Sequence, residues 1–243
     1  YDDSKFDILA AKIMGGGSAV NMMSITRPIQ ADFNNWAQRG NTEWSWGEML
    51  PILKKMESDR DYPNHPLHGS DGPLHCERRL DFTDPIDGIE KALVEGAQAM
   101  GITNSPDQNI LSPYGISRTV SNIKSHRRQS AAAVYLDPAR KRRNLTILDK
   151  AQVLAINFKG SRATGVHYSR DGTSRVAKAD HIVLSAGVYH SPQILLLSGI
   201  GPKNELKKHS IKTIHELKGV GASLQDHSVV TMQFKASRLT KTD

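Results

Sequence analysis

Three consecutive glycines, Gly15, Gly16 and Gly17, follow an apolar stretch and precede the residues "SAVN". Such a turn can hold an anion, because the backbone N–H groups at the start of a helix are unpaired and lie at the positive end of its dipole. A dinucleotide loop needs more: a strand, then G-x-G-x-x-G, then a helix. Gly15 and Gly17 match the first two glycines, but Val20 takes the third place. The pattern therefore predicts no Rossmann phosphate loop here, while anion binding at the turn stays open.

Three histidines, His65, His68 and His75, lie close together in the segment "HPLHGSDGPLHCE". Their spacing is irregular, and Cys76, the single cysteine of the chain, completes no zinc pattern, so we expect no metal site. A thiol redox pair would need a second cysteine. Hydrolysis through a nucleophile elbow would need a G-x-S-x-G motif, which the sequence lacks. We expect Cys76 to be a small, buried hydrophobic residue.

The elements around these residues alternate between helical and extended patterns. Helices are predicted at 17–37, at 47–57, at 84–100, in "QSAAAVYLDPAR", and in "SPQILLLSGIG" from Ser191 and Pro192 to Gly199. Strands are predicted at Leu145–Leu148, Val153–Phe158 and His181–Ser185, with a hairpin around Asp171-Gly172. The order predicts an α/β fold, α+β overall. Trp36, Trp44 and Trp46 are expected to pack in a core or between domains.

The composition excludes several classes of protein. The chain has 243 residues and a formal net charge of +7, but its densest basic cluster, Arg140–Arg143, carries no interleaved aromatic residues. A nucleic-acid platform would need them, so we interpret the cluster as a solvated surface and expect no nucleic-acid partner. No apolar run approaches the roughly 18 residues that span a membrane. One cysteine favours a reducing compartment, and we expect a cytoplasmic location.

Five segments in order resemble a known family. They are "GGGSAVN" with the following "ADFNNWAQRGNTEWSWGEMLPILKKMES", then "HGSDGPLH", "RRQSAAAVYLDPARKRRNLTIL", "VLSAGVYHSPQILLLSGIGP" and "GVGASLQDH". Together they resemble the glucose–methanol–choline (GMC) flavoprotein oxidoreductases along nearly the whole chain. One departure is Pro28, where the family usually has glycine. The resemblance implies a partial GMC fold, with a Rossmann-like FAD-binding domain and part of a sheet-and-helix substrate domain.

The resemblance also implies which residues contact FAD. These are Gly16, Gly17, Ser18, Asn21, Val153, Ala186, Gly187, Asp226 and His227. In some members a histidine just before the asparagine is bonded covalently to the flavin. Val20 stands in that place here, so we expect FAD to be held without a covalent bond. His190 and His227 are expected near the flavin as structural or electrostatic groups rather than as catalysts.

The implied reaction is the oxidation of an alcohol to an aldehyde or ketone, with hydride transfer to flavin N5. The family's phosphate loop is expected before Lys12 and its catalytic histidine beyond Asp243, so this chain is expected to be a central fragment without activity of its own. The remainder of its own chain or another subunit is the expected partner. Choline, aliphatic, aryl and pyridoxine-like alcohols all stay open as the substrate, as does the choice between oxidase and dehydrogenase. The alternative function is an inactive remnant that acts as a binding or interaction module.

The resemblance implies a division of the chain into five parts. The FAD-binding domain is expected to contain residues 1–35 and 140–228. Residues 36–79 are expected to connect the domains and cover the flavin, and residues 80–139 to belong to the substrate domain. Residues 229–243 are expected to begin a strand of that domain.

Overall fold

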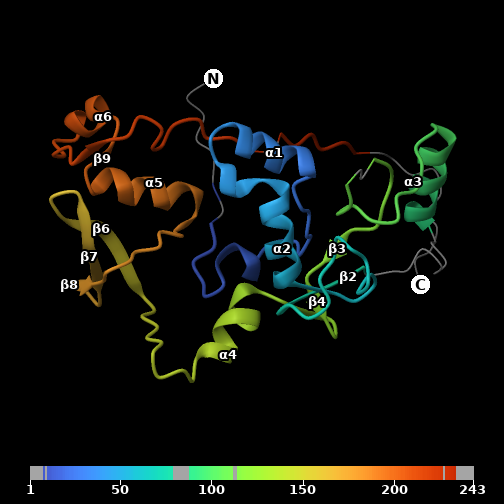
Figure 1. Cartoon of the computed structure of the whole chain (residues 1–243), viewed down its shortest axis with the longest axis horizontal. Helices are drawn as coiled ribbons and strands as arrows, with labels where there is room; N and C mark the ends of the chain where they lie inside the picture. Colours follow the sequence, from blue (N-terminus) through green and yellow to red (C-terminus); the bar gives the residue numbers. More distant parts are fainter. Residues whose placement is uncertain (1–7, 9, 79–87, 112–113, 227, 234–243) are drawn as a thin grey trace. The chain divides into compact units, whose positions relative to one another are not determined.

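The structure is a computed structural model that describes residue 8 and residues 10–78, 88–111, 114–226 and 228–233. It contains two compact units, the first within residues 1–145 and the second within residues 146–235 (Figure 1). The two units are described one at a time.

Aromatic side chains join the helices of the first unit. Helix α1 (Gln30–Gln38) is followed by the short 3-10 helix η2 (Thr42–Trp44) and by α2 (Trp46–Met56). Phe33 is buried, and its ring lies 5.4 Å from that of Trp36 and 5.8 Å from that of Trp46. Trp36 in turn contacts Trp44 edge-on at 5.8 Å. The three tryptophans therefore pack against Phe33 or one another, but Trp36 and Trp44 are 40% and 49% exposed, so the predicted core position is not confirmed for them.

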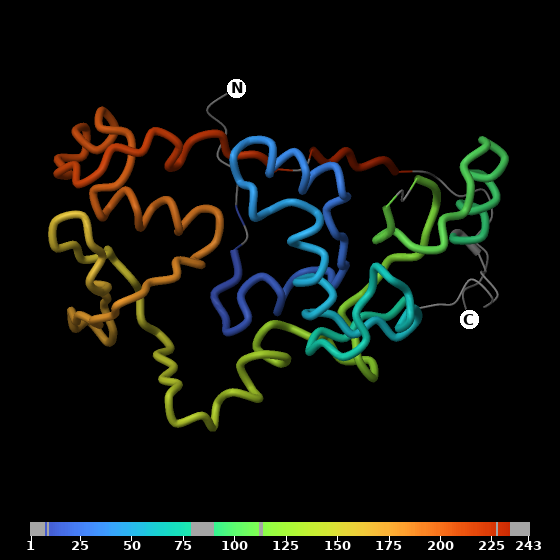
Figure 2. The backbone as a smooth tube through the Cα atoms, viewed as in Figure 1, coloured from blue at the N-terminus to red at the C-terminus, as the bar shows by residue number. Residues whose placement is uncertain are grey.

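Short strands follow α2 in the first unit. Strand β1 (Glu57–Asp59) pairs in parallel with β2 (Leu74–Arg78), and β3 (Val120–Ser121) lies antiparallel on the other side of β2. Strands β4 (Ile123–Lys124) and β5 (Arg127–Arg128) form a tight hairpin. The remaining described helices of this unit are the 3-10 helix η1 (Gly16–Ala19), α3 (Gly88–Ala99), the π-helix η3 (Ala132–Leu136) and α4 (Asp137–Ala139). Figure 2 traces this path from the blue N-terminal segment to the yellow-green segment.

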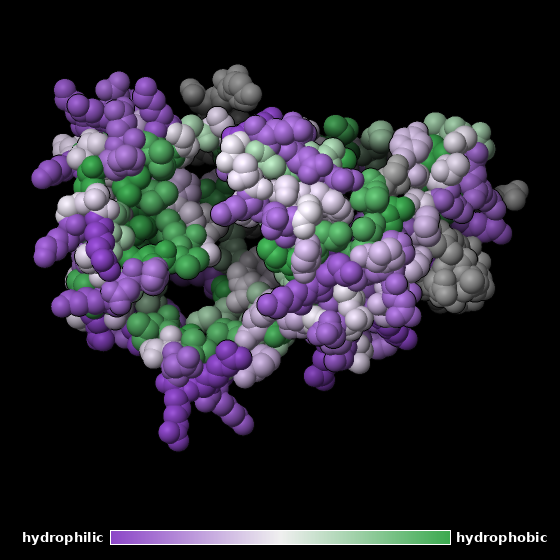
Figure 3. All heavy atoms as spheres, viewed as in Figure 1, coloured by the Kyte–Doolittle hydropathy of each residue, from purple (hydrophilic) through white to green (hydrophobic). Residues whose placement is uncertain are grey.

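The second unit is built on an antiparallel sheet. Its strands are β6 (Ala151–Lys159), β7 (Arg162–Arg170) and β8 (Thr173–Lys178), in that order. Helix α5 (Gly187–Leu197) lies against β6, where the Ile156 N–H donates to Ser198 Oγ at 2.8 Å. Strand β9 (Ile200–Gly201) pairs with β10 (His215–Glu216), and α6 (Lys203–Lys208) lies between them in the chain. Hydrophobic side chains gather over α5 (Figure 3).

Several predicted elements are confirmed. Helix α2 and the centre of β6 match the predictions, as does the hairpin, whose Asp171 and Gly172 both have positive φ. The predicted strands Leu145–Leu148 and His181–Ser185 are wrong. Both are apolar, but neither pairs with a strand among the described residues, and Val183 is 88% exposed. An extended segment becomes a strand only when its backbone groups find a partner.

Two predicted helices differ from the structure. The predicted helix at 17–37 is confirmed only at its end: Gly16–Ala19 form a 3-10 turn, and α1 begins at Gln30, after Pro28. Gly15 and Gly16 have positive φ at the start of the 3-10 turn, and proline disfavours helical geometry in the residue before it. Helix α5 begins four residues before the predicted Ser191, so Pro192 lies inside it.

The fold class is confirmed as a mixture of helices and sheets. Among the described strands only β1–β2 and β9–β10 pair in parallel, so these residues form no extended parallel sheet. Residues 228–233 form no strand, and the five-part division of the chain stays a prediction. Within the described ranges, every helix is too short or too polar to cross a membrane.

The loop between β1 and β2 depends on glycine at a point of close backbone contact. A Cβ on Gly69 would lie 1.9 Å from Lys54 O and 2.5 Å from Glu57 O, both of them backbone atoms. We therefore expect Gly69→Ala to lower the free energy of unfolding by about 1–3 kcal/mol, measured by urea unfolding. Gly96→Ala is the matched control, because a Cβ there meets no atom within 4 Å and alanine favours the helix. Equal stability of the two variants would contradict the close contact.

Candidate functional site

The glycine turn of the first unit has one packed side and one open side. Gly15 and Gly16 have φ of 93° and 54°, in the left-handed region that favours glycine. A Cβ on Gly15 would lie 3.2 Å from the Cβ of Ala132, so this residue packs against η3. A Cβ on Gly16 or Gly17 would meet no atom within 4 Å. The backbone at these two glycines is therefore open to close approach by a ligand.

The turn is held by residues about one hundred positions later in the chain. Ser18 Oγ donates to Gly15 O at 2.5 Å and accepts the Ala131 N–H at 2.9 Å, so its proton is used inside the turn. The Asn122 N–H donates to Met23 O at 3.0 Å. These bonds attach the turn and the segment after it to the segment that carries β3, β4 and β5. A contact between Ser18 and FAD stays a prediction.

The predicted site residues of the second unit lie on different elements. Gly187 begins α5 with φ of 85°, and a Cβ there would meet no atom within 4 Å. Ala186 precedes it, and its N–H donates to Ser191 Oγ at 3.0 Å. Val153 lies in β6 opposite Tyr168, and Asp226 lies in an exposed segment without regular structure. His227 is outside the described residues. Contacts of these residues with FAD also stay predictions.

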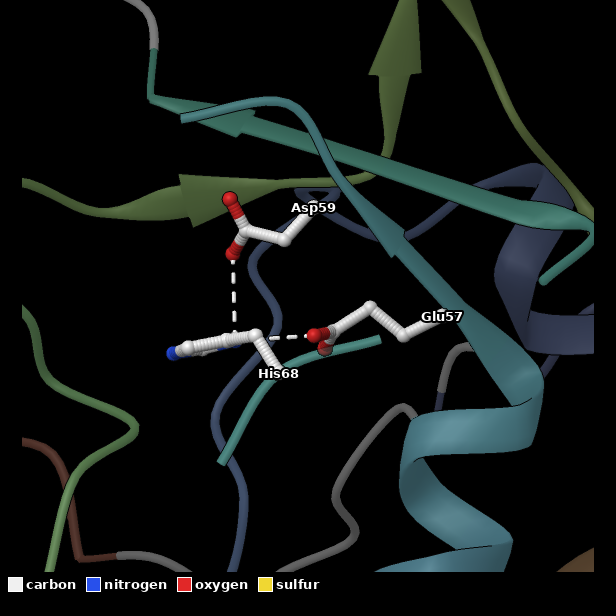
Figure 4. Close-up of side chains that lie close together, drawn as sticks. All are labelled: Glu57, Asp59 and His68. Carbon is white, nitrogen blue, oxygen red and sulfur yellow. Dashed lines mark hydrogen bonds and ion pairs between the residues drawn. The ribbon is translucent and has the colours of Figure 1, made fainter. Parts of the chain in front are cut away.

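A buried histidine forms the centre of a second constellation, which the sequence analysis missed. The Nδ1 atom of His68 lies 2.8 Å from Glu57 Oε1 and 3.2 Å from Asp59 Oδ2 (Figure 4). Its Nε2 atom lies 2.9 Å from Asp107 Oδ2. Ionised carboxylates only accept hydrogen bonds, so both ring nitrogens donate and the ring is an imidazolium. The His68 side chain is 1% exposed.

Two arginines complete this constellation. Arg27 pairs with Glu57 and also donates to Leu67 O at 2.6 Å. Arg78 pairs with Asp59 at 3.0 Å and with Asp107 at 2.6 Å. Three positive groups therefore face three buried carboxylates, and Arg78 also pairs with the partly exposed Asp61 at 3.1 Å. We call these six residues the His68 network: Arg27, Glu57, Asp59, His68, Arg78 and Asp107.

The His68 network has distances that could suit a metal ion, but its charges do not. Ligand atoms of Glu57, Asp59 and His68 lie within 4.8 Å of one another. A metal would need the lone pair of a neutral His68 and would add two positive charges beside Arg27 and Arg78. The carboxylates already have cationic partners, so the donor set fits ion pairs better than a metal centre.

The pairing in the His68 network shifts the pKa values of its members. Burial alone would lower the pKa of His68, but hydrogen bonds to Asp107 and Glu57 and the charges of Glu57 and Asp59 raise it to about 9. Burial would raise the pKa of Asp107, but hydrogen bonds from His68 and Arg78 lower it to about 2. Next to the network, burial and the charges of Glu57 and Asp59 raise the pKa of the Cys76 thiol to about 12. Cys76 therefore stays protonated and buried, as predicted.

The raised pKa of His68 predicts how stability depends on pH. The pKa of His68 rises from 6.5 in the unfolded chain to about 9 in the folded protein. The contribution of His68 to the free energy of unfolding is therefore complete below pH 6.5 and is lost as the pH rises through 9. We expect the stability gap between the wild type and His68→Gln to narrow by about 3 kcal/mol over that range, measured by urea unfolding. A constant gap for His68→Gln would contradict the charged network.

Comparisons with known proteins cover nearly the whole chain. Residues 2–229 match the family model described as GMC oxidoreductase. The chain is 36% identical over 231 residues to an uncharacterized GMC-type oxidoreductase of Rhodococcus erythropolis, covering 95% of this chain and 45% of that protein. It is 37% identical over 217 residues to an oxygen-dependent choline dehydrogenase of Rhizobium etli, covering 89% of this chain and 38% of that protein.

Solved structures show the same relationship. Pyridoxine 4-oxidase from Mesorbium loti has a TM-score of 0.80 at 28% identity, over 86% of this chain and 41% of that one. An FAD-dependent oxidoreductase from Chaetomium thermophilum also has a TM-score of 0.80, at 29% identity, over 88% of this chain and 39% of that one. The chain thus spans less than half the length of these relatives. With the family model matched over residues 2–229, the chain belongs to the GMC oxidoreductase family.

Proposed function

We propose that this chain is part of an FAD-dependent oxidoreductase that oxidises an alcohol to an aldehyde or ketone. The observation that carries the proposal is the open glycine turn of the first unit, found in a chain that belongs to an oxidoreductase family. One similar solved structure is described as FAD-dependent, and two relatives are named for choline and pyridoxine, which both carry a hydroxyl on carbon. A small-molecule alcohol is therefore the proposed substrate.

The residues of the chain fit a dinucleotide cofactor. Gly16, Gly17 and Gly187 each leave the space of a Cβ empty, which allows the backbone to approach a ligand closely. Gly187 also begins a helix of 11 residues, whose first N–H groups favour a negatively charged ligand. When bound, the flavin supplies the redox chemistry by accepting hydride from the alcohol carbon. The protein positions the cofactor and excludes water.

A base must remove the hydroxyl proton, and His68 does not fit this role. Its ring is buried, both its nitrogens donate to carboxylates, and its pKa of about 9 keeps it protonated at neutral pH. A base needs a free lone pair within reach of the substrate. We assign the base to a histidine outside these 243 residues, as the family resemblance implies.

The alternative is a remnant that binds a partner without catalysis. The two proposals predict different flavin contents and activities for the complete protein that contains these 243 residues. The oxidoreductase proposal predicts flavin in the complete protein and no turnover by the 243 residues alone.

The substrate should reduce the flavin of the complete protein. We expect it to purify with a flavin absorbance band, and we expect choline, an aliphatic or aryl alcohol, or pyridoxine to bleach that band under anaerobic conditions. The matched ethers, which lack the hydroxyl proton, should leave the band unchanged. A complete protein that neither contains flavin nor changes the spectrum of added FAD would contradict the proposal and favour the remnant.

Denaturation of the protein should release the flavin, because we expect no covalent bond between them. Val20 has no nucleophilic atom, so we expect acid precipitation of the complete protein to release all flavin into the supernatant, where its fluorescence is measured. A denatured protein band that retains flavin fluorescence would contradict non-covalent binding. Val20→His provides the comparison, because it introduces at this position the histidine that some family members bond covalently to the flavin.

A further inference from the structure

We propose that Arg128 is a positioning residue that fixes the side-chain amide of Asn21 with its NH2 group toward the cofactor. This inference rests on the proposed function, because it needs a flavin nucleotide at the glycine turn. The inference adds Arg128, which lies 107 positions after Asn21 in the chain, to the residues proposed to shape the cofactor site. It also states which group of the Asn21 amide faces the cofactor.

The contacts of Arg128 converge on one short stretch of backbone. Its Nη1 atom donates to Asn21 O at 2.7 Å, to Asn21 Oδ1 at 2.7 Å and to Ser18 O at 3.3 Å. The two shorter contacts are charge-assisted hydrogen bonds, which are roughly twice as strong as neutral ones. They lie at the end of the 3-10 turn whose Gly16 and Gly17 are open to a ligand.

These contacts determine the orientation of the Asn21 amide. A guanidinium has only donors, so the atom that faces it must be the amide oxygen. The Met23 N–H donates to the same Oδ1 atom at 3.1 Å, which gives an independent reason for the same assignment. With two donors on Oδ1, the group of Asn21 left for a ligand is the NH2. A flavin nucleotide offers phosphate and ring acceptors for such a donor.

Arg128 itself is held by its hairpin. It lies in β5, opposite Ile123 of β4, and the Gln129 N–H that follows it donates to Asn122 O at 2.8 Å. Asn122 is buried and its own N–H donates to Met23 O. The hairpin is thus bonded to the segment after the turn, and Arg128 reaches the turn from a defined place. Its neighbour Arg127 is exposed and provides a matched control of the same residue type.

The test compares Arg128→Ala, Arg127→Ala and Asn21→Asp in the complete protein. FAD affinity is measured by fluorescence titration of the apoprotein, and the visible spectrum of bound flavin is recorded. We expect Arg128→Ala to weaken FAD binding about tenfold and to shift the flavin spectrum, since one oriented hydrogen bond is lost. Arg127→Ala should behave as the wild type.

Asn21→Asp distinguishes positioning from a purely structural role. A carboxylate accepts the same bonds from Arg128 and Met23, so it preserves the turn, but it replaces the outward NH2 with an acceptor. We expect it to weaken FAD binding at least tenfold while the melting temperature of the apoprotein stays unchanged. Wild-type affinity in Asn21→Asp, or equal affinities in Arg128→Ala and Arg127→Ala, would overturn the inference and leave the proposed function standing. A wild-type protein that binds no FAD would overturn both.

Discussion

The first unit depends on the pairing of buried charges around His68. Carboxylates from β1 and from the loop at Asp107 cannot be buried alone, because an unpaired buried charge costs several kcal/mol. The three cations of the His68 network come from three other places: the segment after the glycine turn, the loop between β1 and β2, and the end of β2. The network forms only when all these segments lie together. Five short stretches of the chain are thereby held in one arrangement.

The glycine turn benefits from this arrangement. Arg27 lies six residues after Asn21, and its backbone N–H donates to Asn109 Oδ1 at 2.9 Å, while its side chain enters the His68 network. Gln108 Nε2 donates to Ile25 O at 2.8 Å, which fixes the same segment from a second side. Nearer the turn, the Ile25 N–H donates to Val120 O of β3 at 2.9 Å, and the Asn122 N–H donates to Met23 O. The open glycines are thus followed by a segment that several hydrogen bonds hold in place, although the turn itself contains little regular structure.

Part of this arrangement could be predicted from the sequence. The hairpin at Asp171-Gly172 follows from local turn chemistry, and α2 follows from hydrophobic periodicity; both signals are contained in a few neighbouring residues. The segments Leu145–Leu148 and His181–Ser185 have the composition of strands, but a strand also needs a pairing partner, and composition does not supply one. The sequence predicts a helix from residue 17, but Gly16–Ala19 form only a 3-10 turn, because the positive φ of Gly15 and Gly16 is incompatible with an α-helix.

The site shows the same division. The glycines and Asn21 belong to a contiguous motif, so a family resemblance suffices to select them. The His68 network and the contact of Arg128 with Asn21 join residues that are tens of positions apart, and no local pattern links them. His68 lies in a Gly- and Pro-rich turn with two other histidines, and only the fold shows that this one is enclosed by carboxylates.

We propose that the open side of the glycine turn faces the cofactor. A crystal structure of the complete protein with FAD tests it most directly. We expect the flavin nucleotide to contact the backbone at Gly16 and Gly17 and to accept a hydrogen bond from the Asn21 NH2 group. A flavin bound elsewhere, with these glycines covered by other protein residues, would contradict it.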